Sequence, residues 1–279
     1  ENEGDSEINE QFDVSIETRS VPIGKAHPLS RAIMNIKEIF VQMGFEEMEG
    51  ELVESTFWNF DALFQPQDHP ARELADTFYV DKTFSLPDKK LVEKVKNSHE
   101  TGWKSKWSED EAKKGVLRTH TTCLSARALA SLKDPYKKYF SVGRVFRNEE
   151  TDFKHLAEFH QVEGILAWNG ASFRDLLGIL KEFYSRLGFN KIRFRPSYFP
   201  YTEPSLEIEV FYEPRKEWME LGGAGIFRPE VTKPLTTIYP VLAWGLSLER
   251  PLMLALGLND IRTFYKNDIN WLRKTRVKG

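Results

Sequence analysis

Two stretches of the sequence decide its fold, Gly143-Arg144-Val145-Phe146-Arg147-Asn148-Glu149 and Phe159-His160-Gln161-Val162-Glu163-Gly164. Each lies within a longer run of alternating side chains, 138–149 and 157–168, and a short loop joins the two runs. Alternation over this length predicts two β-strands, and the short connection predicts that they pair as an antiparallel hairpin.

The predicted hairpin sorts its polar residues, because successive side chains of a strand point to opposite faces. Arg147 and Glu149 would share one face of the first strand. Phe159, Gln161 and Glu163 would share one face of the second strand. A single surface could therefore present a guanidinium, two carboxylates, an amide and an aromatic ring. Alternation alone fits an exposed sheet face as well as a binding face, so both interpretations stay open.

A third stretch, Ala243-Trp244-Gly245-Leu246-Ser247-Leu248-Glu249-Arg250, leads from a strand beginning near Val241 into an apolar helix over 249–256. Arg250 would lie in the first turn of that helix, where a positive charge opposes the helix dipole by roughly 0.3–1 kcal/mol. An arginine at this place is favoured if it faces an anion. A solvent-screened arginine fits the sequence as well.

The other elements follow from periodicity and turn residues. Apolar residues recur at helical spacing from Leu29, with Pro28 before them and Gly44 after them, which predicts a helix. The remaining expected elements are a strand over 45–53, helices over 121–132 and after a Ser172–Asp175 cap, and strands over 191–195, 206–212 and 217–221. Hairpins without βαβ repeats predict an α+β domain, with a mixed, mostly antiparallel sheet flanked by helices.

The charge pattern divides the chain. Residues 1–26 begin with a dense acidic run, which is typical of a linker or extension left from a longer protein. The segment 27–272 is long enough for one large domain as well as for two small ones. Within it, residues 81–115 are rich in lysine and acidic residues, and they predict a mobile surface insertion with a short helix. Residues 273–279 form a basic tail.

Composition excludes several classes of protein. The chain has 279 residues, of which 41% are hydrophobic, so it can bury a large core. It contains no run of about 18 apolar residues, which excludes a membrane span. The single cysteine, Cys123, excludes an internal disulfide and a thiolate-rich zinc site, and a reducing, cytoplasmic location is expected. The formal charge of -3 gives no general attraction for nucleic acid, so RNA binding would need a local patch or a partner subunit.

Two of these stretches resemble sequence motifs of the class II aminoacyl-tRNA synthetases. Phe146-Arg147-Asn148-Glu149 is similar to motif 2, and Gly245-Leu246-Ser247-Leu248-Glu249-Arg250 is similar to motif 3. The helix from Leu29 and the strand after it resemble motif 1, the dimerisation element. Gly50-Glu51 stand where motif 1 usually has a proline, and this departure leaves the detail of a subunit interface open.

Longer stretches resemble the α-subunit family of phenylalanyl-tRNA synthetase, in its archaeal and eukaryotic type. These stretches are His27-Pro28-Leu29, 57–72 (from Phe-Trp-Asn-Phe-Asp to Asp-His-Pro-Ala-Arg), Leu117-Arg118-Thr119-His120-Thr121-Thr122, 158–164, 198–205 and 220–225. The resemblance covers roughly residues 27–272. The family usually carries an N-terminal RNA-binding extension, which this sequence lacks.

This resemblance implies a class II catalytic fold and a two-step reaction. L-Phenylalanine would be activated with ATP to phenylalanyl-adenylate, and the acyl group would then pass to the 2′-hydroxyl of the 3′-terminal ribose of tRNA(Phe). The implied partners are a β subunit, in an α2β2 heterotetramer, and the tRNA. Mg²⁺ is the implied metal ion, and the enzyme would be cytoplasmic. Hydrolytic proofreading would lie on the β subunit.

The resemblance also gives individual residues a role. For ATP, Arg147 would bind the α-phosphate, Glu149 would lie near the adenine or the amino group, Phe159 would stack on adenine and Arg250 would bind the γ-phosphate. For phenylalanine, the ammonium would meet Gln161 and Glu163, with His120 and Thr122 near its carboxylate and ammonium, and the ring would lie between Phe199 and Tyr201, against Ala243 and Gly245. Ser125 stands where the family often has a glutamine. Glu207 and Glu220 would be the magnesium-linked carboxylates.

Two other functions compete with this interpretation. One is a related class II enzyme that charges phosphoserine or pyrrolysine. A phosphoserine pocket needs cationic donors, which the expected aromatic walls do not offer, and pyrrolysine enzymes resemble the sequence less over 57–72. The other is a catalytically inactive paralogue that serves as an RNA-binding or regulatory module. The presence of Arg147, Glu149 and Arg250 counts against it.

Overall fold

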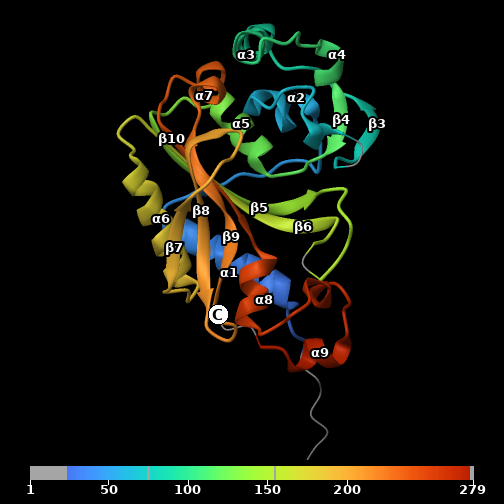
Figure 1. The fold of residues 1–279 in the computed structure, drawn as a ribbon, viewed down its shortest axis with the longest axis vertical. Coiled ribbons are helices and arrows are strands. Elements are labelled where there is room, and N and C mark those ends of the chain that lie inside the picture. The colour runs from blue at the N-terminus through green and yellow to red at the C-terminus, as the bar shows by residue number, and fades with distance from the viewer. Residues whose placement is uncertain (1–23, 74–75, 154, 277–279) are drawn as a thin grey trace, which may run out of the picture.

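The computed structural model describes residues 24–73, 76–153 and 155–276 (Figure 1). The expected acidic segment 1–26 therefore lies almost wholly outside the described residues, as does the end of the expected basic tail. None of the described helices is long and apolar enough to cross a membrane.

A seven-stranded sheet forms the body of the molecule, in the order β1-β5-β6-β10-β9-β8-β7. Its strands are β1 Glu46–Glu47, β5 Tyr136–Phe146, β6 Glu158–Trp168, β7 Ile192–Pro196, β8 Thr202–Tyr212, β9 Glu217–Phe227 and β10 Val241–Ser247. Only the β1–β5 pair is parallel, and the other neighbouring strands are antiparallel. The mixed, mostly antiparallel sheet of an α+β domain is thus confirmed.

Helices cover both faces of this sheet. Side chains of its strands point alternately to the two faces, and apolar side chains occur on both. Leu242, Trp244 and Leu246 of β10 belong to the apolar core shared with α1 and α6. Val241 and Ala243 belong to a second core shared with α5 and α7. The bounds of these helices are α1 Pro28–Gln42, α5 Thr122–Ala130, α6 Phe173–Arg186 and α7 Pro229–Leu235. The C-terminal part also contains α8 Glu249–Ala255, the 3₁₀ turn Ile261–Phe264 and α9 Ile269–Lys274.

Local capping explains where two helices begin. At α1, the His27 ring accepts a hydrogen bond from the Leu29 amide at 3.1 Å, and Pro28 occupies the first turn. Gly44 follows α1 with a φ of +82°, a left-handed conformation that glycine adopts without strain. At α6, Ser172 and Asp175 form a reciprocal capping box. Both helices were predicted from these residues, and both predictions are confirmed.

A smaller sheet, in the order β2-β4-β3, lies at one end of the molecule together with α3 and α4 (Figure 1). Its strands are β2 Val53–Ser55, β3 Tyr79–Thr83 and β4 Lys114–Leu117, and the helical segments around it are α2 Thr56–Asn59, the 3₁₀ turns Asp61–Leu63 and Pro70–Arg72, α3 Lys89–Gly102 and α4 Glu109–Ala112. The aromatic stretch 57–72 is therefore ordered and largely buried.

The structure corrects three details of the predicted elements. The single strand expected over 45–53 is two strands, because β1 pairs with β5 and β2 pairs with β4 of the other sheet. The first strand of the hairpin ends at Phe146, so Arg147 and Glu149 follow it. The helix expected to be short within residues 81–115 is α3, which has 14 residues, and the same segment also supplies β4, the central strand of the smaller sheet.

Candidate active site

A pocket of about 470 Å³ opens on the large sheet beside β6, β9 and β10, and the start of α8 contributes to its wall. The lining includes all but one of the site residues named from the sequence. Those that line it are His120, Thr122, Arg147, Glu149, Phe159, Gln161, Glu163, Phe199, Tyr201, Glu220, Ala243, Gly245 and Arg250. The exception is Glu207.

Glycines on the central strands make room for the pocket. A Cβ atom at Gly245 would lie 2.6 Å from Gln161 Nε2, and a Cβ atom at Gly223 would lie 2.4 Å from the Phe199 ring. Contacts this short do not occur without displacement of the neighbour. The absence of a side chain at Gly245 of β10 and at Gly223 of β9 therefore leaves room for the side chains of Gln161 and Phe199.

Glu163 lies at the buried end of the pocket and is 1% exposed. Its carboxylate accepts hydrogen bonds from Gln161 Nε2 at 2.8 Å, Thr122 Oγ1 at 3.0 Å and Ser125 Oγ at 3.1 Å. Burial raises the pKa of Glu163 to about 8, although the three donors oppose the shift. A cationic ligand group beside Glu163 would compensate its ionised form.

His120 lies just before α5, lines the pocket and is 6% exposed. Burial, and then the charge of Arg147, lowers the pKa of His120 to about 3, although backbone groups of Asn59 and His120 itself favour the protonated ring. Neither ring nitrogen has a well-oriented hydrogen-bond partner within the described residues. The neutral ring has one donor and one acceptor nitrogen, and both are buried.

Two arginines supply the positive charge of the pocket. Arg147 follows β5, donates from Nε to the Thr119 carbonyl oxygen at 3.3 Å, and has its guanidinium carbon 5.1 Å from the centre of the Phe159 ring. Arg250 lies in the first turn of α8, and its Nη1 is 3.8 Å from Glu220 Oε2. Both guanidinium groups remain partly exposed, so both can accept further anionic partners.

An aromatic wall closes one side of the pocket. Phe199 and Tyr201 come from the turn between β7 and β8, and the Tyr201 ring centre lies 5.9 Å from that of His120. Burial raises the pKa of the Tyr201 hydroxyl, so it stays neutral. Phe227, at the end of β9, also lines the pocket and was not named from the sequence. Its position depends on the full length of β9, which was predicted to end at Leu221.

Sequence reasoning also missed the role of Glu249, a pocket residue with a fully buried side chain. Its Oε1 accepts hydrogen bonds from the His160 amide at 2.8 Å and the Tyr265 hydroxyl at 2.7 Å, and the His160 ring Nδ1 lies 2.8 Å away. Glu249 thereby joins the start of α8 to β6. The sequence signal that could have indicated this role is the position of Glu249, a carboxylate directly before Arg250 at a strand-to-helix turn.

The two carboxylates expected for magnesium each lie beside an arginine in this structure. Glu207 accepts hydrogen bonds from Arg195 Nη2 at 2.7 Å and Ser197 Oγ at 2.9 Å, and this pairing lowers the pKa of Glu207. Glu220 faces Arg250. No group of three or more His, Cys, Asp or Glu side chains that could hold a metal ion occurs among the described residues. Magnesium is commonly held by one or two carboxylates together with substrate phosphates, so the binding of magnesium by Glu207 and Glu220 stays a prediction.

The family model of the tRNA synthetases class II core domain (F) matches residues 11–275. The chain belongs to this family. The match confirms the class II fold that the sequence motifs implied. A solved structure agrees: the crystal structure of pyrrolysyl-tRNA synthetase from Desulfitobacterium hafniense has a TM-score of 0.63 to this chain, covers 90% of it and 77% of that protein, and is 15% identical.

Relatives of this class II domain carry a more specific name. Phenylalanine–tRNA ligase α subunits from Methanopyrus kandleri, Methanothermobacter thermautotrophicus and Methanocaldococcus jannaschii are 54%, 52% and 52% identical to it. The alignments cover 94%, 96% and 94% of this chain, and 52%, 54% and 56% of those proteins. The resemblance to this α-subunit family is confirmed, and the chain spans about half the length of these relatives.

Proposed function

We propose that this class II domain is the catalytic part of a phenylalanine–tRNA ligase α subunit. It activates L-phenylalanine with ATP and transfers the phenylalanyl group to the 3′-terminal ribose of tRNA(Phe). In the cell it would act in the cytoplasm with a β subunit, in an α2β2 assembly. The relatives' names and the sequence identity support this assignment.

One observation carries the proposal: a single pocket combines two kinds of binding group. Arg147 and Arg250 provide guanidinium groups suited to a triphosphate, whereas Gln161 and Glu163 provide an amide and a carboxylate suited to an ammonium. The aromatic wall and Ala243 supply an apolar slot beside them. A pocket for phenylalanine and ATP needs the guanidinium groups, the ammonium ligands and the apolar slot together.

The chemistry requires positioning and charge compensation rather than a protein base. The phenylalanine carboxylate is ionised at neutral pH, so an oxygen of it can attack the α-phosphorus of ATP directly. The new bond joins that oxygen to phosphorus, and the bond between the α-phosphorus and the bridging oxygen breaks, so pyrophosphate leaves with the electron pair. Arg147 is assigned to the α-phosphate and Arg250 to the γ-phosphate, where each would stabilise negative charge.

Glu163 fits the role of ammonium ligand. In the ligand-free pocket its buried carboxylate favours the protonated form. An ammonium placed beside it would restore the ionised form, so binding of an amino acid with a free ammonium is coupled to loss of a proton. Gln161 and Thr122, which donate to the same carboxylate, would hold it in place.

The experiment that tests the proposal is ATP–pyrophosphate exchange by the complete enzyme with a panel of amino acids. We expect exchange with L-phenylalanine, weaker exchange with L-tyrosine and none with phosphoserine or pyrrolysine. An apolar pocket rejects an added hydroxyl by only about a hundredfold, so some tyrosine activity is expected. Exchange stimulated by phosphoserine or pyrrolysine in place of phenylalanine would contradict the proposal, as would a folded enzyme without exchange.

A further inference from the structure

The most distinctive stretch of the sequence, residues 57–72, lines no part of the pocket among the described residues. It is nevertheless buried: the exposed fractions of Asn59, Phe60 and Asp61 are 0%, 1% and 1%. A buried asparagine and aspartate need partners to offset their lost hydration. Those partners show what the stretch does.

Asn59 binds the loop that carries His120. Its Nδ2 donates to Thr119 Oγ1 at 3.0 Å, and its Oδ1 accepts from the Thr119 backbone amide at 3.3 Å. Thr119 in turn accepts, at its carbonyl oxygen, the hydrogen bond from Arg147 Nε. Thr119 therefore links Asn59 by hydrogen bonds to Arg147, the arginine assigned to the α-phosphate.

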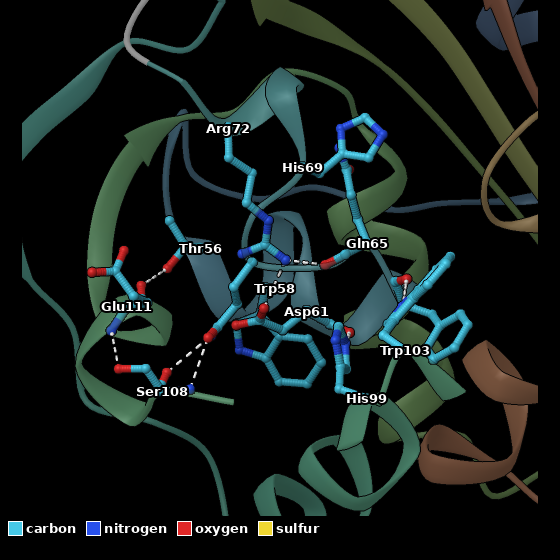
Figure 2. A network of polar contacts seen from close by, with 12 residues as sticks. Thr56, Trp58, Asp61, Gln65, His69, Arg72, His99, Trp103, Ser108 and Glu111 are labelled. Carbon is cyan, nitrogen blue, oxygen red and sulfur yellow. Dashed lines mark hydrogen bonds and ion pairs between the residues drawn. The ribbon is translucent and has the colours of Figure 1, made fainter. Parts of the chain in front are cut away.

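Phe60 supports the same loop from behind. Its ring lies edge-on to the His120 ring, with centres 6.3 Å apart, and the Arg72 guanidinium carbon lies 4.8 Å from the Phe60 ring centre. Arg72 is held by Asp61 Oδ1 at 2.7 Å and by the Gln65 carbonyl oxygen (Figure 2). The Asp61–Arg72 ion pair thus holds the Arg72 guanidinium over the ring of Phe60, and that ring packs against His120.

On its other side, the stretch is tied to the α3–α4 region. His99 Nε2 lies 2.7 Å from the Asp61 carbonyl oxygen, and Trp103 Nε1 donates to the Phe64 carbonyl oxygen at 3.0 Å (Figure 2). Gln67 makes a reciprocal pair with Ser108, donating to its carbonyl oxygen at 2.9 Å and accepting from its amide at 2.7 Å. These hydrogen bonds join residues 57–72 to the α3–α4 region, and none of them involves a residue that lines the pocket.

We propose that residues 57–72 are a positioning element for the substrate pocket, and that Asn59 is the residue through which they act. By fixing Thr119, Asn59 sets the place of the Arg147 guanidinium and of the His120 ring. The inference deepens the proposed function and rests on it, since Arg147 and His120 receive their roles there. Asn59 itself touches no substrate and is a positioning residue.

The chain offers a matched pair of variants. Asn59→Leu removes a reciprocal amide pair that faces the pocket loop, and Gln67→Met removes a similar reciprocal pair that faces α4. Thr119→Val removes only the hydroxyl that Asn59 binds, and Thr119→Ser keeps it. If Asn59→Leu does not fold, the Thr119 pair tests the same contact with a smaller change.

The variants are made in the full-length chain, assembled with the subunits that co-purify with it, and compared at equal folded fraction. We expect Asn59→Leu and Thr119→Val to lower kcat/KM for phenylalanine-dependent exchange by about tenfold or more, because misplacement of a charge-stabilising group is costly. KM for both ATP and phenylalanine should rise. Gln67→Met and Thr119→Ser should stay within about twofold of the parent.

Amide hydrogen exchange of the 117–123 region gives a readout that needs no activity. It should become faster in Asn59→Leu and stay unchanged in Gln67→Met, because only Asn59 accepts from the Thr119 amide. A folded Asn59→Leu enzyme with the kinetics and loop exchange of Gln67→Met would overturn the inference. A parent enzyme without phenylalanine-dependent exchange would instead overturn the proposed function, and loop exchange would still decide whether Asn59 fixes the loop.

Discussion

Gln161 and Glu163 lie on one face of β6, and the Gln161 amide donates a hydrogen bond to the Glu163 carboxylate at 2.8 Å. The same carboxylate oxygen also accepts from Thr122, on the helix that packs against β6. The pocket therefore contains a buried carboxylate that is held in place before any ligand arrives.

This carboxylate predicts proton release on phenylalanine binding. The pKa of Glu163 is raised to about 8 in the free pocket, so its carboxyl group is mostly protonated at about pH 6.5. A ligand ammonium favours the ionised form and lowers that pKa, so close to one proton should leave. The release should shrink as the pH rises above about 8. Calorimetric titration in two buffers of different ionisation enthalpy measures it.

Ligand analogues provide the control for this titration. Phenylalaninol keeps the ammonium and should release a proton, whereas phenylpropionate lacks it and should release none. Equal release with both analogues would show that the proton comes from a group other than one facing the ammonium.

Gly245→Ala should weaken phenylalanine binding without unfolding the domain. The added methyl group would lie 2.6 Å from Gln161 Nε2, so the amide must move away from Glu163. We expect KM for phenylalanine to rise by about tenfold, as loss of a hydrogen bond to a charged group implies. Gly178→Ala on α6 is the control: nothing lies within 4 Å of its new Cβ, and it should leave KM unchanged.

Ala243→Gly should admit para-substituted phenylalanines. Ala243 lines the apolar slot, and removal of its methyl group leaves room for one substituent atom. Discrimination against para-chloro-phenylalanine in aminoacylation should fall by about tenfold or more. Ala167→Gly removes the same group from a buried residue of β6 that is not among the residues lining this pocket, and it should not change the discrimination. An unchanged preference in Ala243→Gly would remove this residue from the slot.

Arg147→Ala should abolish phenylalanine-dependent pyrophosphate exchange while the fold stays intact. Loss of a group that stabilises developing charge costs about a hundredfold or more in kcat. Arg144→Ala is the matched control: Arg144 lies three residues earlier, forms a half-exposed ion pair with Glu158 at 3.2 Å and is not among the residues lining this pocket. Surface ion pairs contribute little stability, so this variant should behave like the parent. Normal exchange in Arg147→Ala would exclude it from the reaction.

The parts of the fold that the sequence predicts well are those governed by local pattern. The hairpin of β5 and β6 and the strand-to-helix passage at β10 and α8 were predicted because alternation and helical spacing are read within a few residues. Gln161 and Glu163 were placed on one face for the same reason. The division of 45–53 into two strands could not be seen, since it depends on pairing with β5 and β4, which are remote in sequence.

Fewer residues of the candidate site could be predicted from the sequence pattern alone. Phe199, Tyr201 and His120 entered only through the family resemblance, because nothing local distinguishes them from core residues. Glu207 is not among the residues that line the pocket, and its carboxylate accepts a hydrogen bond from Arg195 on the neighbouring strand β7, a partner that the sequence pattern did not indicate. The positioning contact of Asn59 with Thr119 joins two segments far apart in the chain and could not be predicted from either.

The most direct measurement of the central claim, that one pocket holds ATP and phenylalanine together, is a structure of the complete enzyme with a non-hydrolysable phenylalanyl-adenylate analogue. We predict the phenyl ring against Phe199, Tyr201 and Ala243, with the ammonium at Glu163 and the phosphate mimic within hydrogen-bond reach of Arg147. An analogue bound with its ring outside this slot, or with its phosphate mimic remote from Arg147, would contradict the account.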